Sequence, residues 1–171
     1  MYSFEFDSII QLKDFQELNS GCFLCVWHAD KIPPHIGISI NGFYYSLKVN
    51  GKDTAIPVYE IVKIINKKNI CSVFAEIFVN IDSVEVERIF SRYKCAKEGE
   101  STCLSPITEM YYLNNQIDIL ADLLNYFKGK QQIGQVFGLN LKSDFKGILP
   151  YGREEIEARL KQLSEKTTRN V

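Results

Sequence analysis

The pattern of apolar and polar positions predicts short strands in the first half of the chain and helices in the second. Residues Cys22–Trp27 are all apolar and follow Gly21, which is typical of a buried strand. The segments His35–Ile40 and 43–49 flank Asn41-Gly42, and Asn-Gly between two apolar runs is the strongest short hairpin signal. We therefore expect two adjacent antiparallel strands here, with a third strand beside them.

The Asn41-Gly42 turn also predicts which residues of the hairpin lie opposite each other. Both residues tolerate the positive φ values of a type I′ turn. The pairing then places Ile38 opposite Tyr45 and His35 opposite Lys48. Residues 50–53, Asn-Gly-Lys-Asp, predict a second turn directly after this hairpin.

The remaining segments show helical spacing, strand-like runs or loop composition. In the first half they predict a short helix within residues 4–18, a loop at 28–34, a helix at 57–68 and a central strand at 72–81. In the second half they predict a helix that begins at Asp82 and turns Val84, Ile89, Phe90 and Tyr93 inward. They then predict a helix from near Cys103 to Phe127 with a break at Asn114-Asn115. A loop with short strands at 129–152 and a helix at 153–165 complete the chain. Strands thus precede helices, which predicts an α+β fold with an antiparallel sheet packed against helices.

Length and charge narrow the classes of protein that fit. A chain of 171 residues corresponds to a single domain, 1–171. Its 20 Lys and Arg against 21 Asp and Glu leave no basic excess, so we expect no nucleic-acid partner. We expect no membrane span, because no apolar run approaches the roughly 20 residues required. Acidic residues near Met1 and an odd count of five cysteines favour a cytoplasmic protein with reduced thiols.

The first cluster with possible chemistry is Cys22-x-x-Cys25-x-x-His28. Two thiols at this spacing match half of a zinc site, and His28 or His35 would supply a third ligand. On a strand, however, positions 22 and 25 point to opposite faces of the sheet. We therefore expect both cysteines to be buried as small apolar side chains, and we rank a metal-binding module last.

A second candidate group lies on the loop and the hairpin that follow the first strand. His28 and Asp30 precede two prolines, and a loop held between rigid strands often carries binding residues. The aromatic run of the hairpin includes Tyr44 and Tyr45. Together these residues form a candidate surface for a small ligand or a partner protein.

The third group pairs Cys103 with His35. Thr102, Ser105 and Pro106 suit a helix start, and a thiol there lies near unpaired backbone N–H groups that stabilise a thiolate. The same N–H groups can hold an oxyanion, and a histidine on a facing strand can transfer the proton. With Thr102 as the helix cap the thiol lies in the first turn, whereas with Ser105 as the cap it precedes the helix.

The order of these elements resembles the circularly permuted papain-like hydrolases, the NlpC-like group that includes YiiX-type proteins and relatives of lecithin:retinol acyltransferase. The matching pieces are a Gly-led apolar strand at 21–26, a strand opening with His35-x-Gly37, a helix at 84–94 and a late cysteine in 101–111. The resemblance covers about residues 20–115 and implies a papain-like core there, with a helical extension at about 116–171. It implies Cys103 as the nucleophile and His35 as the general base.

Family members orient the histidine with a third residue, which usually comes from the neighbouring strand. Lys48 would lie opposite His35, but a cation disfavours the imidazolium that must form. Ser46 and Asn50 lie on the diagonals of the same face and could orient the ring through a neutral hydrogen bond.

These residues together lead to two hypotheses about function. We expect a cysteine hydrolase or acyl-transfer enzyme that acts on an amide or acyl group of a small molecule or peptide and uses no metal or organic cofactor. The alternative is an inactive papain-like scaffold that binds a small ligand or a protein.

Overall fold

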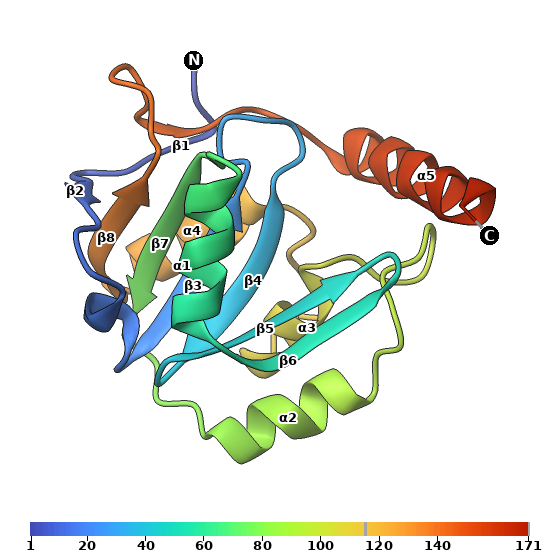
Figure 1. The fold of residues 1–171 in the computed structure, drawn as a ribbon, viewed down its shortest axis with the longest axis horizontal. Helices are drawn as coiled ribbons and strands as arrows, with labels where there is room; N and C mark the ends of the chain where they lie inside the picture. The colour runs from blue at the N-terminus through green and yellow to red at the C-terminus, as the bar shows by residue number, and fades with distance from the viewer. Residues whose placement is uncertain (115, 171) are drawn as a thin grey trace.

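The structure, a computed structural model, describes residues 1–114 and 116–170 as strands, helices and connecting loops (Figure 1). The strands are β1 (Phe4–Glu5), β2 (Ile10–Gln11), β3 (Cys22–Trp27), β4 (His35–Ile40), β5 (Phe43–Lys48), β6 (Gly51–Pro57), β7 (Ser72–Ile77), β8 (Ile133–Leu139) and β9 (Gly147–Ile148). The helices are the 3-10 turn η1 (Phe15–Leu18), α1 (Val58–Lys67), α2 (Ser83–Ser91), α3 (Ser105–Met110), α4 (Leu120–Gly129) and α5 (Arg153–Arg169).

Seven of the strands form one sheet in the order β2-β8-β7-β3-β4-β5-β6. The pairings are antiparallel except for β2 with β8, which is parallel, so the sheet is mixed rather than wholly antiparallel. The short strands β1 and β9 pair separately. The α+β class predicted above is confirmed.

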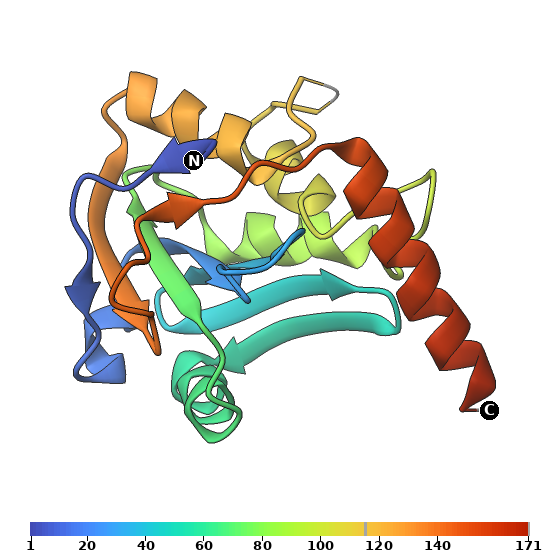
Figure 2. The ribbon, with the colours of Figure 1, turned by 90° about the horizontal axis from the view of Figure 1, so that it is seen from above.

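Helices cover both faces of the sheet, as the turned view in Figure 2 shows. Helix α1 lies on one face, and α2, α3 and α4 lie on the other. The two-residue alternation of strands divides the side chains between the two cores. On β4, Ile36, Ile38 and Ile40 enter the core shared with α2–α4, so His35 and Gly37 face the α1 side.

The hairpin prediction is confirmed near the turn, but the pairing of β4 with β5 ends at Gly37 and Ser46, so His35 does not pair with Lys48 as expected. Asn41 and Gly42 have φ values of 47° and 83°, and Ile38 pairs with Tyr45 as expected. The predicted strand at Cys22–Trp27 and the helix after Pro57 also form where the pattern placed them. The last helix begins at Arg153 as predicted and continues to Arg169.

The second turn was misplaced. The chain turns at Val49 and Asn50, and β6 already begins at Gly51. Asp53 is therefore a strand residue that pairs with Ser46, and not part of a turn. This difference changes the composition of the candidate site described below.

Near the N-terminus the helix expected within residues 4–18 is wrong. Strands β1 and β2 pair with β9 and β8, and helical structure is limited to η1. Pairing with distant strands outweighs the local spacing of apolar residues. The strand expected at 72–81 is also shorter, because β7 ends at Ile77.

The second half contains further differences. Val84 does not face inward but is 69% exposed, because the helix turns Val86, Ile89 and Phe90 toward the core. The segment expected as a helix from Cys103 to Phe127 with a break at Asn114-Asn115 forms two helices, α3 and α4, on either side of that point, and Asn115 itself lies outside the described residues. The segment expected as a helical extension also contributes β8, which lies inside the sheet between β2 and β7.

Candidate functional site

A pocket of about 950 Å³ opens at the end of the sheet where β4 begins and β5 ends. Five of the residues predicted for the site line it: His28, His35, Tyr44, Asn50 and Cys103. Their side chains come from the β3–β4 loop, the β4–β5–β6 meander and the segment before α3. Cys103 and His35, the pair expected to carry the chemistry, thus both line one cavity, with Cys103 packed against the core on the α2–α4 side of the sheet and His35 facing the α1 side.

The pocket exists because β4 and β5 separate. Pairing between β3 and β4 continues to Trp27 and His35, whereas pairing between β4 and β5 stops at Gly37 and Ser46. Beyond that point the carbonyl of Lys48 accepts a hydrogen bond from the N–H of Ala96 at 2.8 Å. The chain leading to Cys103 is therefore attached to the end of β5, beside the opening.

Cys103 comes directly before the residue that caps α3. The helix begins at Ser105 with Leu104 as its cap, which corresponds to the second of the two alternatives above. Thr102 and Ser105 stabilise the turn, because the Ser105 hydroxyl accepts from the Thr102 N–H at 2.9 Å and the Thr102 hydroxyl accepts from the Leu104 N–H at 3.1 Å. Cys103 is half-buried at this position.

The surroundings of the Cys103 sulfur act on its pKa in opposite directions. Burial raises the pKa to about 11, because a thiolate loses hydration there. The backbone N–H groups of Ile36, Cys103 and Leu104 lower it. The sulfur therefore lies beside the strand residue that follows His35 and is protonated at neutral pH.

His35 is half-buried at the start of β4, and its ring lies 6.4 Å from the ring of Trp27 between centroids. Burial lowers the pKa of His35 to about 4; the charge of Asp53 raises it, and Lys48 lowers it. The imidazole is therefore neutral at pH 7, and its lowered pKa makes it a weaker proton acceptor than an exposed histidine. No hydrogen bond joins it to the Cys103 thiol within residues 1–114 and 116–170.

Asp53 is the site residue that the sequence analysis missed. Its carboxylate accepts hydrogen bonds from the Ser46 hydroxyl at 2.9 Å and from the Lys48 ammonium at 2.7 Å. It lines the same pocket as His35 and favours the protonated ring. If the strand had been predicted to begin at Gly51, the two-residue alternation would have identified Asp53 as a candidate site residue.

The two residues proposed to orient His35 have different surroundings. Ser46 is fully buried and its hydroxyl donates to Asp53, so its hydrogen is already engaged. Asn50 lies in the β5–β6 turn and lines the pocket. Asp53 is the better candidate, because an anion stabilises the imidazolium that forms during proton transfer.

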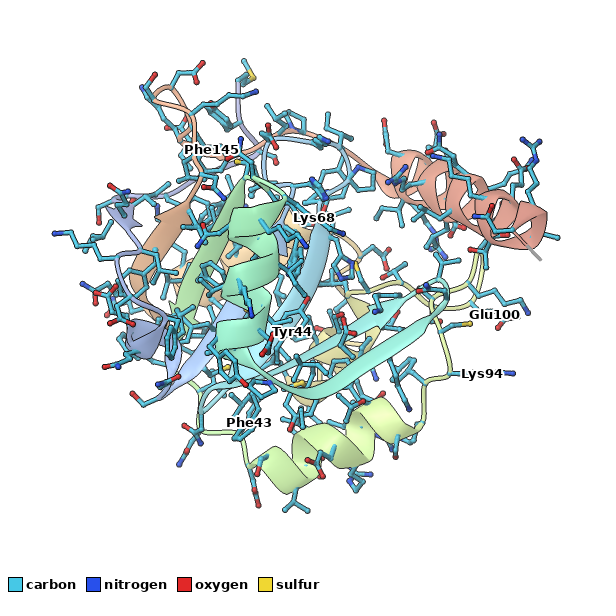
Figure 3. The ribbon with its side chains drawn as sticks, viewed as in Figure 1. Phe43, Tyr44, Lys68, Lys94, Glu100 and Phe145 are labelled. Atoms are coloured by element: carbon cyan, nitrogen blue, oxygen red, sulfur yellow. The ribbon has the colours of Figure 1, made fainter. Side chains whose placement is uncertain are left out.

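Contrary to expectation, the aromatic hairpin does not present Tyr44 and Tyr45 on an exposed surface, although Tyr44 lines the pocket from within the fold. Both are buried, on opposite faces of the sheet, because consecutive strand residues alternate. Tyr45 donates to Glu87 at 3.3 Å on the α2 side. Tyr44, labelled in Figure 3, lies between β5 and α1 and packs on Trp27 with the ring centroids 5.9 Å apart.

His28 and Asp30 have separate surroundings. His28 lines the pocket, whereas Asp30 forms an ion pair with Lys142 at 3.3 Å. Cys22 and Cys25 lie in the two different cores, as expected from the alternation of a strand. Within the part of the chain that the structure describes, no group of His, Cys, Asp and Glu side chains could hold a metal ion.

Comparison of the chain with protein-family models, with curated proteins and with solved structures finds no match. The resemblance to permuted papain-like hydrolases therefore stays a prediction. Among the described residues no helix is long and apolar enough to cross a membrane.

Proposed function

We propose that this chain is a cysteine hydrolase or acyl-transfer enzyme, with Cys103 as nucleophile and His35 as general base. The observation that carries the proposal is that these two residues, distant in sequence, line one pocket with the sulfur beside Ile36. Asp53 adds the charge that a histidine base needs when it becomes protonated. The substrate class is an amide, ester or thioester.

The proposed reaction begins with both groups neutral. His35 removes the thiol proton as the Cys103 sulfur attacks the carbonyl carbon, so a carbon–sulfur bond forms and the carbonyl oxygen becomes an anion. The backbone N–H groups near the sulfur are the candidate donors to this oxyanion. The anion then collapses, the bond from the carbonyl carbon to the leaving nitrogen, oxygen or sulfur breaks, and His35 gives its proton to that leaving atom. Water or an acceptor attacks the resulting thioester while His35 takes its proton, and the carbon–sulfur bond breaks as Cys103 regains that proton from His35.

Asp53 acts through His35 in this scheme. The carboxylate faces Ser46 and Lys48 as well as the pocket, so its own position is held from two sides. When His35 gains a proton, the negative charge of Asp53 stabilises the imidazolium. We therefore assign Asp53 as a positioning residue.

The alternative function is a binding scaffold without catalysis. It is favoured by the raised pKa of Cys103 and the lowered pKa of His35, which keep both groups uncharged. It is also favoured by the lack of a hydrogen bond between the two side chains in the described part of the chain. In that case the pocket would hold a ligand without turning it over.

Release of p-nitrophenolate from p-nitrophenyl acetate distinguishes the two functions. We expect wild-type protein to release it faster than free cysteine does, and Cys103→Ala to abolish this acceleration. We expect His35→Ala to lower the rate roughly 100-fold, the lower range for removal of a general base. His28→Ala, which changes the other histidine of the same pocket, is the matched control and should retain most of the rate.

An equal rate in wild type, Cys103→Ala and His35→Ala would support the scaffold instead. Circular dichroism of each variant establishes that the fold is retained, so that a lost rate is attributed to chemistry.

A further inference from the structure

Besides Lys48, which is paired with Asp53, and Lys166 near the end of α5, three cations from separate elements line the same pocket: Lys31 in the loop between β3 and β4, Lys68 directly after α1, and Arg159 in α5. Figure 3 labels Lys68 at the end of α1, with α5 across from it. Burial lowers the pKa of the His28 ring most, and the charge of each of these three cations lowers it further, against the opposing charge of Asp30, which is paired with Lys142. Three segments that are distant in the sequence thus place positive charge on one wall of the pocket.

These cations lack acidic partners, although acids are nearby. Both acids that line the pocket are engaged elsewhere, Asp53 with Lys48 at 2.7 Å and Asp118 with Arg153 at 3.9 Å. Within residues 1–114 and 116–170, Lys31, Lys68 and Arg159 form no ion pair. Arg159 donates instead to the neutral amide oxygen of Gln162 at 2.6 Å.

This local excess is not a consequence of composition. The whole chain has one more acid than base. Gathering cations without counter-charges costs free energy through mutual repulsion, and an anionic ligand would remove that cost. The wall therefore has the charge expected of an anion subsite.

Apolar side chains lie in the same cavity. Ile32 and Ile64 line it and remain 47% and 39% exposed, which leaves apolar surface in contact with water. A volume of about 950 Å³ is at the upper end of the range for small-molecule sites. A ligand with an apolar portion and an anionic group satisfies both kinds of surface.

We propose that Lys31, Lys68 and Arg159 bind the anionic group, a carboxylate or a phosphate, of an otherwise apolar ligand. The identity of this ligand as the substrate rests on the proposed function, whereas its binding does not. Cys103 lies beside Ile36. The charge of His28 acts on His35, and the charges of the three cations act on His28. The anion of a substrate would thus lie on the His28 side of the reacting carbonyl.

Isothermal titration calorimetry with three probes that share an eight-carbon chain tests the subsite. The probes are octanoate, octyl phosphate and 1-octanol, and the protein is full-length Cys103→Ala, which binds without turnover. We expect at least one anionic probe to bind more tightly than 1-octanol, and the tighter of the two identifies carboxylate or phosphate as the preferred group. We expect Lys68→Gln and Arg159→Gln each to weaken anion binding about threefold and to leave 1-octanol unchanged.

Lys63→Gln and Lys161→Gln are matched controls on the same two helices, because neither residue lines the pocket. Equal affinity for 1-octanol and both anions would overturn the subsite, as would an equal loss in the controls. If the anions bind as predicted but no ester is cleaved by wild type, the subsite stands and the proposed hydrolase fails. If esters are cleaved without preference for anions, the hydrolase stands and the subsite fails.

Discussion

Gly37 lies beneath the ring of Tyr44 on the α1 face of the sheet. A Cβ atom at Gly37 would lie 2.4 Å from the Tyr44 hydroxyl oxygen and 2.5 Å from two of its ring carbons. Tyr44 is fully buried, and its ring packs on that of Trp27. This contact gives a physical reason for a glycine two residues after His35.

We therefore expect Gly37→Ala to lower the free energy of unfolding by about 2 kcal/mol, the typical cost of overpacking a core. Urea denaturation followed by fluorescence measures it. Gly129→Ala is the control: a Cβ there meets nothing within 4 Å, and the change should stabilise α4 by roughly 0.5–1 kcal/mol. A Gly37→Ala protein as stable as wild type would contradict the described packing.

The depressed pKa of His35 predicts how stability depends on pH. The unfolded chain binds this proton near pH 6.5, whereas the folded chain binds it only near pH 4. Between these values the unfolded state holds more protons, so the free energy of unfolding falls as the pH is lowered. His35 accounts for about 3 kcal/mol of this loss.

Urea denaturation of wild type and of His35→Asn at pH 4, 5, 6 and 7 measures this dependence. These values are roughly 1 unit apart and span the interval between the folded and unfolded pKa of His35. We expect the wild-type curve to be steeper below about pH 6.5 and parallel to the variant above it. Parallel curves over the whole range would show that His35 is not desolvated.

At the scale of elements, local turn chemistry and periodicity predicted the hairpin, α1 and the start of α5 correctly. Asn41 and Gly42 have the positive φ values that these two residue types tolerate. The pairing of β2 with β8 and the position of β8 inside the sheet depend on contacts between the two ends of the chain. No local pattern contains that information, which is why residues 4–18 were predicted as helix.

The same distinction applies to the site. His35, Cys103 and His28 were identified from residue type and turn context, and all line the pocket. Asp53 was missed because residues 50–53 were predicted as a turn. The strand β6 begins at Gly51, so Asp53 is a strand residue whose side chain has a defined face. Tyr45 was assigned to a surface because burial on both faces of the sheet depends on helices far away in sequence.

The β5–β6 hairpin carries a prediction about His35. Replacing Asp53 with Asn removes the charge that raises the pKa of His35 and leaves the opposing charge of Lys48. We expect the His35 pKa in Asp53→Asn to fall below its wild-type value, and the rate of ester cleavage to fall with it. Proton NMR titration of the ring measures the pKa.

The chain contains only two histidines, so His28→Ala assigns the ring signals. Asp7→Asn, an exposed ion-pair residue outside the pocket, is the matched control and should not move the His35 pKa. An unchanged pKa in Asp53→Asn would remove Asp53 from the site.

At the scale of the whole molecule, segments that are far apart in the sequence enclose one cavity. The sheet supplies His35, the segment before α3 supplies Cys103, and α5 closes a side through Leu160. Helix α5 is polar over most of its surface, and Leu160 is its only buried residue among those described. The site is thus a property of the complete fold and not of any one motif.

All five cysteines are free thiols, and they differ in their surroundings. Cys22, Cys25 and Cys71 are buried, and Cys95 and Cys103 are half-buried. Of these, only Cys103 lines the described pocket with His35. The other four cysteines are therefore internal controls for the reactivity of Cys103.

Peptide mass spectrometry after brief exposure to p-nitrophenyl acetate tests the central claim most directly. The proposed mechanism predicts an acetyl thioester on Cys103, formed before any other thiol reacts and lost when His35 is replaced by Ala. Acetylation that appears first on Cys95, or that marks Cys103 equally with and without His35, would contradict it.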